Sequence, residues 1–424
     1  MKTRILKFLS LGLPLYLALR LHAQDSVTTL AGQLLVSGQT NGTTDQATFD
    51  DPAAIVTDSQ GSLFIADSQN HVIREISTNG LVMVFAGRMG NSGTADGAGT
   101  NAAFNAPSGL ALNPSGDLYV SDTGNNTIRK ISPDGVVTTI AGIAGYPGFA
   151  DGPAGMAHFS SPQGLAVAPN GALLIADCGN HCIRLLTNGI VSTFAGKPQI
   201  WGSQDGTGTN AEFNGPLGMA FDTPGNLYVS DANNDTIRMI TSNAVVTTFA
   251  GSAGCDGSSD GERTNARFRS PAGLVFDQWD DLFVADSFNQ TIREITTNGI
   301  VSTVSGVSGE VGAENGNNGV GRFYNPFGLA LARDGSLLVS DTYNELVRSV
   351  IVPFQINASS PSSAPVLTLS WKTVAGKSYQ PQFRTSFSEA WQNLGPALTA
   401  AHASLVVTDT LANPTRIYRV VRLN

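Results

Sequence analysis

The stretch that decides the fold is Gly109–Gly142, GLALNPSGDLYVSDTGNNTIRKISPDGVVTTIAG, because its landmarks return five more times along the chain. The Asp that closes the LYVSD run recurs at intervals of 55, 55, 54, 55 and 55 residues. An Asn follows each such Asp after three residues, and an Arg after seven. A fixed period of this length indicates one supersecondary unit that has been copied. The Asp and Arg pairs are Asp67 and Arg74, Asp122 and Arg129, Asp177 and Arg184, Asp231 and Arg238, Asp286 and Arg293, and Asp341 and Arg348.

Each repeat reads as four short strands. In the quoted stretch, runs rich in Val, Ile, Leu, Tyr and Thr are separated by Pro-Ser-Gly, Gly-Asn-Asn and Pro-Asp-Gly, which form turns. No apolar spacing of three or four residues is long enough for a helix. Four antiparallel strands in each of six repeats predict an all-β fold, a six-bladed β-propeller.

The repeat resembles the NHL-repeat family of β-propellers over roughly residues 27–352. The resemblance rests on P-x-G-L-A, then G-x-L-Y-V-A/S-D-x-x-N-x-x-I-R-x-I, then G-x-V-x-T-x-A-G. The sequence departs from this pattern where Ala54 replaces the first Gly of blade one and Asp280 replaces the turn Gly of blade five.

Blade six lacks a T-x-A-G strand after Val347-Arg348, and that strand is found at the other end of the repeats. Val27–Gly32, VTTLAG, matches a fourth strand that has no first three strands before it. We therefore predict that this N-terminal strand closes blade six, which leaves no exposed sheet edge between the first and last blades.

Four segments are expected along the chain. Residues 1–23 have a basic start and the apolar run Phe8–Leu19, which predicts a secretory signal peptide and a secreted, periplasmic or cell-surface protein. Residues 25–352 form the propeller, and the Ser- and Pro-rich residues 353–365 are expected to be a linker. Residues 366–424 predict a small β-sandwich, similar to C-terminal modules of secreted bacterial proteins, with Trp371, Trp391 and Tyr418 in its core. We expect a monomer without a membrane span.

The charge of the propeller argues against a nucleic-acid partner. The whole chain carries −9, and setting aside four basic residues of the leader and a net four positive charges from residue 353 onward leaves −17. Some NHL propellers bind RNA through a basic face, but this one lacks the cations that neutralise phosphates. The expected partner is a glycan, a peptide or a protein.

The repeats carry extra residues between T-x-A-G and the next Phe-x-x-Pro. In an up-and-down blade these inserts emerge on the same face as the Asp-x-x-Asn turns, and long loops on a rigid scaffold commonly bind ligands. The candidate binding residues on this rim are Tyr146, Phe149, Trp201, Phe327, His71 and His181.

The repeated residues have a structural interpretation. Six copies of the Asp and Arg pair argue for an ion pair within or between blades, with the Asn capping the turn. His71 and His181 occupy a position at which this family often carries His, so a structural role is favoured over a metal there. Six Phe residues at matched positions are expected to fill the space between blades: Phe49, Phe104, Phe159, Phe213, Phe268 and Phe323.

An enzymatic alternative stays open. Six-bladed propellers that resemble this one include peptide-amidating lyases with three His on zinc and metal-dependent, gluconolactonase-like lactonases. The propeller offers His71, His158 and His181, and two of them lie on turns two blades apart, which disfavours one zinc site. The residues where the inner strands enter the channel are Ala53, Ser108, Gln163, Leu217, Ala272 and Phe327. They supply no acid, base or nucleophile with an obvious partner. We therefore predict no catalytic residue, metal or cofactor.

Two of the three cysteines flank one turn of blade three. Cys178 and Cys182 are expected to face each other across the hairpin and form a disulfide in an exported protein. A metal-binding pair is the weaker alternative, and Cys255 is left without a partner.

Overall fold

The structure is a computed structural model that describes residues 21–22, 26–317, 320–352, 355–359, 366–373, 376–384, 389–401, 404–410 and 417–423. The chain divides into two compact units, Ser26–Ile351 and a second unit that contains Val352–Asn424. The predicted signal peptide lies outside the described residues except for Leu21–His22, strand β1. In the described part of the chain, no helix is both long and apolar enough to cross a bilayer.

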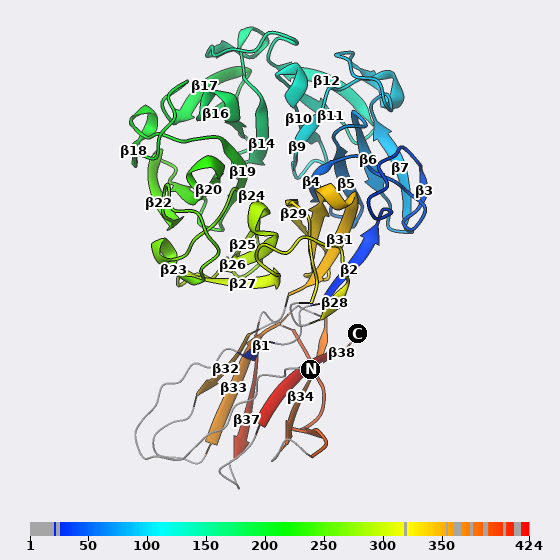
Figure 1. Ribbon diagram of the computed structural model, residues 1–424, viewed down its shortest axis with the longest axis vertical. Coiled ribbons are helices and arrows are strands. Elements are labelled where there is room, and N and C mark those ends of the chain that lie inside the picture. Colours follow the sequence, from blue (N-terminus) through cyan, green and yellow to red (C-terminus); the bar gives the residue numbers. More distant parts are fainter. Residues whose placement is uncertain are drawn as a thin grey trace. The chain divides into compact units, whose positions relative to one another are not determined.

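The first unit is a six-bladed propeller, as the repeat predicts. Six antiparallel sheets surround a central channel (Figure 1). Blade two runs outward from the channel as β9 (Pro107–Leu112), β10 (Leu118–Asp122), β11 (Thr127–Ile131) and β12 (Val136–Ala141). The innermost strands of the other blades are β4 (Pro52–Thr57), β14 (Pro162–Val167), β19 (Pro216–Phe221), β24 (Pro271–Phe276) and β29 (Pro326–Leu331).

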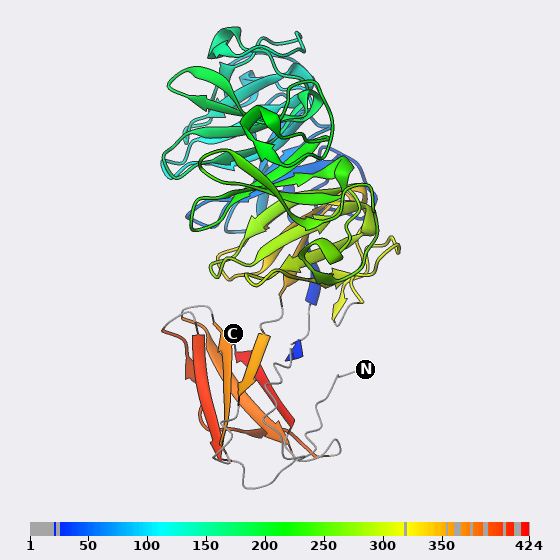
Figure 2. The ribbon, with the colours of Figure 1, turned by 90° about the vertical axis from the view of Figure 1, so that its left-hand side faces the viewer.

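The second, third and fourth strands follow the same order in the remaining blades. Figure 2 shows the same sheets after a turn of 90° about the vertical axis. A one-turn 3-10 helix joins the second and third strands of blades two to six: η2 (Thr123–Asn125), η4 (Cys178–Asn180), η6 (Ala232–Asn234), η8 (Ser287–Asn289) and η9 (Thr342–Asn344). In blade one these strands are β5 (Leu63–Asp67), β6 (Val72–Ile76) and β7 (Leu81–Ala86), and in blade three they are β15 (Leu173–Asp177), β16 (Cys182–Thr187) and β17 (Ile190–Ala195). Blade four has β20 (Leu227–Asp231), β21 (Thr236–Ile240) and β22 (Val245–Gly251), and blade five has β25 (Leu282–Asp286), β26 (Thr291–Ile295) and β27 (Ile300–Gly306). The second and third strands of blade six are β30 (Leu337–Asp341) and β31 (Leu346–Ile351).

Each blade has one strand more than the four that we predict. The insert before a blade adds a two-residue strand to its outer edge, and such a short strand has no alternation to detect in the sequence. These strands are β3 (Gly42–Thr43), β8 (Gly97–Ala98), β13 (Gly152–Pro153), β18 (Gly206–Thr207), β23 (Gly261–Glu262) and β28 (Gly316–Asn317). In blades two to five a 3-10 turn follows: η1 (Gly99–Asn101), η3 (Ala154–Met156), η5 (Gly208–Asn210) and η7 (Arg263–Asn265).

The ring closes as predicted. Strand β2 (Ser26–Ala31) pairs antiparallel with β31, and Val27 lies opposite Val350 in that register. Blade six therefore takes its fourth strand from the N-terminal end of the unit, which joins its two ends through backbone hydrogen bonds.

Glycine lets the inner strands meet backbone to backbone where they begin. A Cβ on Gly109 would lie 2.0 Å from the carbonyl oxygen of Gln163 in the next blade, and one on Gly164 would lie 2.0 Å from that of Leu217. Gly218, Gly273 and Gly328 repeat this approach, with distances of 2.1 to 2.3 Å. Only at the seam between blades one and two does a side chain, that of Ala54, occupy this position. We call this constriction the glycine collar.

The described residues of the second unit form two sheets. One joins β1, β32 (Gln355–Ser359), β33 (Val366–Lys372) and β37 (Ser404–Thr410); the other joins β34 (Ser378–Arg384), β35 (Gln392–Asn393), β36 (Leu398–Thr399) and β38 (Ile417–Leu423). Their shared core is Leu369, Trp371, Tyr379, Ala400 and Val420.

The structure can be compared with three predictions for this unit, those for the linker, Trp391 and Tyr418. Residues 355–359, part of the predicted linker, form a strand instead, because the Ser- and Pro-rich composition starts only at its end; residues 353–354 and 360–365 lie outside the described part. Trp391 is half-buried and stacks on Arg384, whose guanidinium carbon lies 4.5 Å from the ring centroid. The side chain of Tyr418 is not among those described.

Candidate functional site

The repeated Asp, Asn and Arg form a buried triad. In blade two, Asp122 Oδ2 accepts hydrogen bonds from Arg129 Nη1 at 2.6 Å and from Asn125 Nδ2 at 2.8 Å. Its Oδ1 accepts the backbone N–H of Asn105 at 2.7 Å. The same three bonds recur in the other blades.

The triad fastens each insert to its blade. Arg129 donates to the carbonyl oxygens of Ala103 and Ala95, both at 2.9 Å, and Asn125 donates to that of Gly93 at 2.7 Å. Phe104, fully buried, lies 5.0 Å below the Arg129 guanidinium, a cation–π arrangement that all six blades share. The insert is therefore held at several backbone points. Six such inserts form one fixed surface.

We call this surface the insert face. It comprises the described residues of the inserts, 33–51, 88–106, 143–161, 197–215, 252–270, 307–317 and 320–325, and the six Asp-x-x-Asn turns. The turns and inserts share one face because the backbone of each contacts the other: the amide of Gly90 donates to Asn70 O at 2.9 Å, and that of Gly145 to Asn125 O at 3.1 Å.

His71 and His181 belong to the scaffold. Both have positive φ, 59° and 56°, at the residue that follows the turn. His71 Nδ1 accepts the backbone N–H of Ala106 at 3.0 Å, and His181 Nδ1 accepts that of Gly215 at 3.2 Å. Burial lowers the pKa of both rings, which favours the neutral form that can accept. The other four blades make the same bond with Asn126, Asp235, Gln290 and Glu345.

The other rim candidates divide into two groups. Tyr146 is 65% exposed and Trp201 is 70% exposed, each on its own insert. Phe149 instead stacks on Arg184, with the guanidinium carbon 4.6 Å from its ring. Phe327 packs against the core between blades one and two and lines the central channel. Tyr146 and Trp201 are thus the candidates that are available to a ligand.

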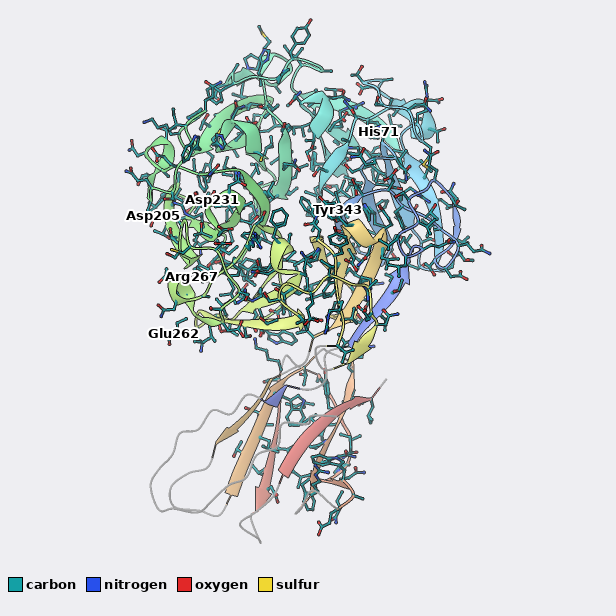
Figure 3. The ribbon with its side chains drawn as sticks, in the orientation of Figure 1. His71, Asp205, Asp231, Glu262, Arg267 and Tyr343 are labelled. Atoms are coloured by element: carbon teal, nitrogen blue, oxygen red, sulfur yellow. The ribbon has the colours of Figure 1, made fainter. Side chains whose placement is uncertain are left out.

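Three further aromatic residues of the insert face were not predicted. Phe288 and Tyr343 are 53% and 46% exposed, and both occupy the third position of an Asp-x-x-Asn turn. Tyr324, 38% exposed, lies with its ring 5.2 Å from that of Tyr343 in an edge-to-face pair. Figure 3 shows Tyr343 near the middle of the ring. The sequence carried a signal here, because the other blades have Gln, Gly or Asn at this turn position.

The central channel holds a cavity of about 440 Å³. All its lining residues are described, and none carries an ionisable side chain. Their hydrogen-bonding side chains are Ser108 and Gln163 at the insert end and Thr57 at the other, and the Ser108 hydroxyl donates to Gln163 Oε1. The channel therefore offers no general acid, base or charged metal ligand.

Two known family models match the repeats of this chain. The family model of the Teneurin NHL domain matches residues 17–132, and that of the NHL repeat matches residues 159–184. The chain belongs to the NHL-repeat family. NHL repeat-containing protein 2 of Gallus gallus is 30% identical over 352 residues, 74% of this chain and 48% of that protein. The NHL chain spans about half the length of that relative.

Solved structures share the propeller fold. An auxiliary nutrient binding protein from Bacteroides ovatus ATCC 8483 is 17% identical, with a TM-score of 0.58 over 77% of this chain and 76% of the other. A gluconolactonase from Xanthomonas campestris is 16% identical, with a TM-score of 0.50 over 77% and 89%. At these identities the likeness shows the fold of the NHL chain alone.

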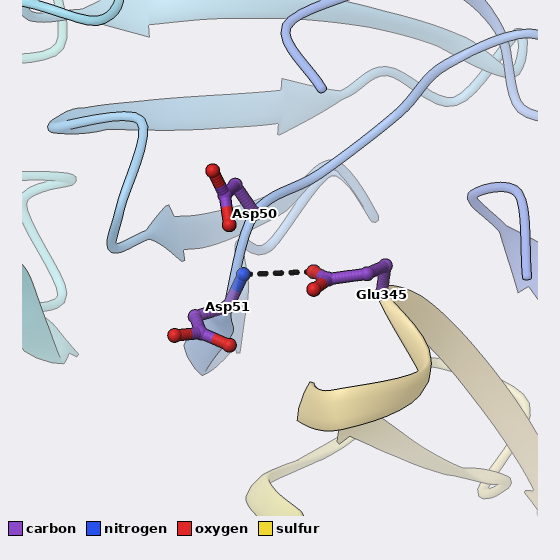
Figure 4. A group of neighbouring side chains, drawn as sticks. All are labelled: Asp50, Asp51 and Glu345. Atoms are coloured by element: carbon purple, nitrogen blue, oxygen red, sulfur yellow. Dashed lines mark hydrogen bonds between the residues drawn. The ribbon is translucent and has the colours of Figure 1, made fainter. Parts of the chain in front are cut away.

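Three carboxylates gather where the NHL ring closes. Asp50, Asp51 and Glu345 have carboxylate oxygens within 4.8 Å of one another (Figure 4). Both oxygens of Glu345 already accept, one from Ser37 Oγ at 3.0 Å and one from the Asp51 N–H at 2.8 Å. Glu345 thus accepts a backbone N–H of the neighbouring insert in blade six, as His71 does in blade one. The contacts of Glu345 therefore make the group part of the ring closure, and they require no metal ion.

Closure of the ring is expected to weaken as pH rises. Burial raises the pKa of Glu345 from 4.5 to about 7, and the neighbouring Asp51 and Asp50 act in the same direction. The folded state therefore retains a proton that the unfolded chain loses, so stability falls as pH rises from about 4.5 to about 7.

Glu345→Gln should remove the part of this dependence that Glu345 contributes. Blade five already uses Gln290 here, and its Oε1 accepts the Asn325 N–H at 2.6 Å. We expect the melting temperature of the variant to gain on the native protein between about pH 5 and about pH 7. Glu262→Gln, at an exposed carboxylate, is the control. An identical pH profile for native protein and Glu345→Gln would contradict the expectation.

The disulfide prediction is wrong: Cys178 and Cys182 are free. In the hairpin of blade three the residue opposite Cys182 is Asp177, so Cys178 lies one position beyond the pair, in η4. At the equivalent position in blade two, the Thr123 hydroxyl points to the next blade and donates to Pro162 O at 2.6 Å. Cys255 is also free, and it is exposed.

Proposed function

We propose that this NHL propeller is an exported, non-catalytic binding module that takes a glycan, peptide or protein ligand on its insert face. The observation that carries the proposal is the exposure of Tyr146 and Trp201, 65% and 70%, on inserts that the buried triads hold in place. A large aromatic ring on a fixed backbone loses little conformational entropy on binding, which is why such residues anchor ligands.

Two further observations support a binding role. The fold is shared with an auxiliary nutrient binding protein. The fold is also shared with a gluconolactonase, yet the described lining of the channel here contains no ionisable side chain with which to run such chemistry. We therefore favour the binding module over a metal-dependent hydrolase or lyase.

The experiment is a binding screen on glycan and peptide arrays with the mature chain. Tyr146→Ala combined with Trp201→Ala should abolish retention of whatever ligand the native protein retains, with an unchanged melting temperature, because both side chains are exposed. Leu81→Ala is the matched control, since Leu81 is 39% exposed but begins β7 at the opposite face. Retention by the double variant equal to that of the native protein, or none by either on both arrays, would refute the proposal.

A further inference from the structure

The central channel combines features that suit one class of small molecule. Its cavity of about 440 Å³ falls in the range of about 300–1,000 Å³ that small-ligand sites occupy. It is bounded by the six inner strands, which belong to the rigid core of the ring, so its shape is set before any ligand arrives.

The channel walls carry hydrogen-bonding backbone. Each inner strand is the last strand of its sheet and is paired on one side only. The unpaired edge of such a strand presents alternate N–H and C=O groups, and here these edges surround the channel. Some backbone groups of the inner strands already have side-chain partners: Pro162 O accepts from the Thr123 hydroxyl, and the Gly109 N–H donates to Ser121 Oγ. Backbone groups that line the channel without such a partner need water or a ligand.

The side chains add apolar surface and one polar pair. Leu217 and Phe327 are half-buried lining residues, and they offer carbon and ring surfaces. Gln163 accepts the Ser108 hydroxyl through Oε1, and its amide N–H groups are donors at the same end of the channel.

This lining excludes several ligand classes. Phosphates and carboxylates need cationic partners, and ammonium groups need anionic or aromatic cages; none of the lining side chains is charged. An alkyl chain would offer no partner to the channel-lining backbone groups that no side chain satisfies. An uncharged polyhydroxylated ring meets both requirements, because its hydroxyls donate and accept while its C–H faces contact apolar side chains.

We infer that the central channel binds an uncharged mono- or disaccharide, with Gln163 and Ser108 contacting its hydroxyls. This site is separate from Tyr146 and Trp201 and does not depend on the function proposed for them.

The test is titration calorimetry of the mature chain with D-glucose, D-galactose, N-acetyl-D-glucosamine and cellobiose. D-glucosamine and D-glucuronate are the charged comparisons. At least one neutral sugar should bind, and its charged counterpart should bind at least about tenfold more weakly.

Two variants locate the sugar. Gln163→Leu removes the amide, and Leu217→Trp fills the channel entrance; each should weaken binding by at least about tenfold, because a site built to pair hydroxyls loses its partners or its space. Gln392→Leu, at an exposed glutamine of the second unit, is the matched control.

Three results would overturn the inference: no neutral sugar binds, the charged sugars bind as well as the neutral ones, or binding persists in both channel variants at native melting temperature. Sugar binding that Tyr146→Ala with Trp201→Ala abolishes and Gln163→Leu spares would belong to the insert face. That outcome would uphold the proposed function while it refutes the channel site.

Discussion

Replacing Arg238 with Ala is expected to lower the free energy of unfolding of the propeller by about 3–5 kcal/mol. Arg238 is fully buried, and its Nη1 lies 2.8 Å from the equally buried Asp231. The substitution leaves that carboxylate without its cation and removes the donors to Glu212 O and Gln204 O, which fasten the insert. Breaking a buried pair by removing one partner costs far more than the pair itself contributes.

Arg269→Ala supplies the comparison. Its side chain is 56% exposed, and its Nε lies 3.4 Å from Oδ2 of Asp256, whose side chain is 61% exposed. Water and salt screen such a pair, so the change should stay within about 0.5 kcal/mol. Urea unfolding followed by circular dichroism measures both variants. Equal stabilities would mean that the triad contributes no more than a surface ion pair, contrary to our interpretation of it.

Gly164→Ala is expected to cost about 3 kcal/mol or more, at the upper end for overpacking, or to prevent folding. The added methyl would lie 2.0 Å from the carbonyl oxygen of Leu217 and 3.3 Å from the Cα of Gly218. Both obstacles are backbone of the neighbouring inner strand, so no side-chain rotation relieves the clash. The blades would have to separate at the glycine collar.

Gly155→Ala is the matched control. No atom lies within 4 Å of where its methyl would be, so we expect a change within about 0.5 kcal/mol. Thermal unfolding of the two variants side by side distinguishes a clash from a general effect of replacing glycine. A Gly164→Ala protein with native stability would show that the inner strands do not meet at the collar.

The six-bladed ring and its closure could be predicted from the sequence, for physical reasons. The 55-residue interval from Asp67 to Asp122 recurs with a single one-residue change, so the number of blades follows from counting. Blade six was the one blade that lacked a fourth strand, and Val27–Gly32 was a fourth strand without a blade. In the structure this N-terminal strand pairs with β31 of blade six. The triad was also foreseeable, because six copies of a pair favour a structural over a catalytic role.

The site was only partly predictable, because exposure depends on contacts between segments distant in sequence. Phe149 and Tyr146 lie three residues apart on one insert, yet Phe149 stacks on Arg184, 35 positions away, while Tyr146 stays exposed. The predicted disulfide between Cys178 and Cys182 is absent because the register of the hairpin places Cys182 opposite Asp177. A count of turn residues does not fix that register.

The claim on which this account depends is that the triads turn six long inserts into one fixed binding face. Amide hydrogen exchange measured by mass spectrometry tests it directly, on residues 88–106, 143–161 and 197–215. We predict that these segments exchange as slowly as the strands that flank them, and that Arg238→Ala speeds exchange in residues 197–215 above all. Rapid exchange of all three segments in the native protein, with no change in the variant, would contradict it.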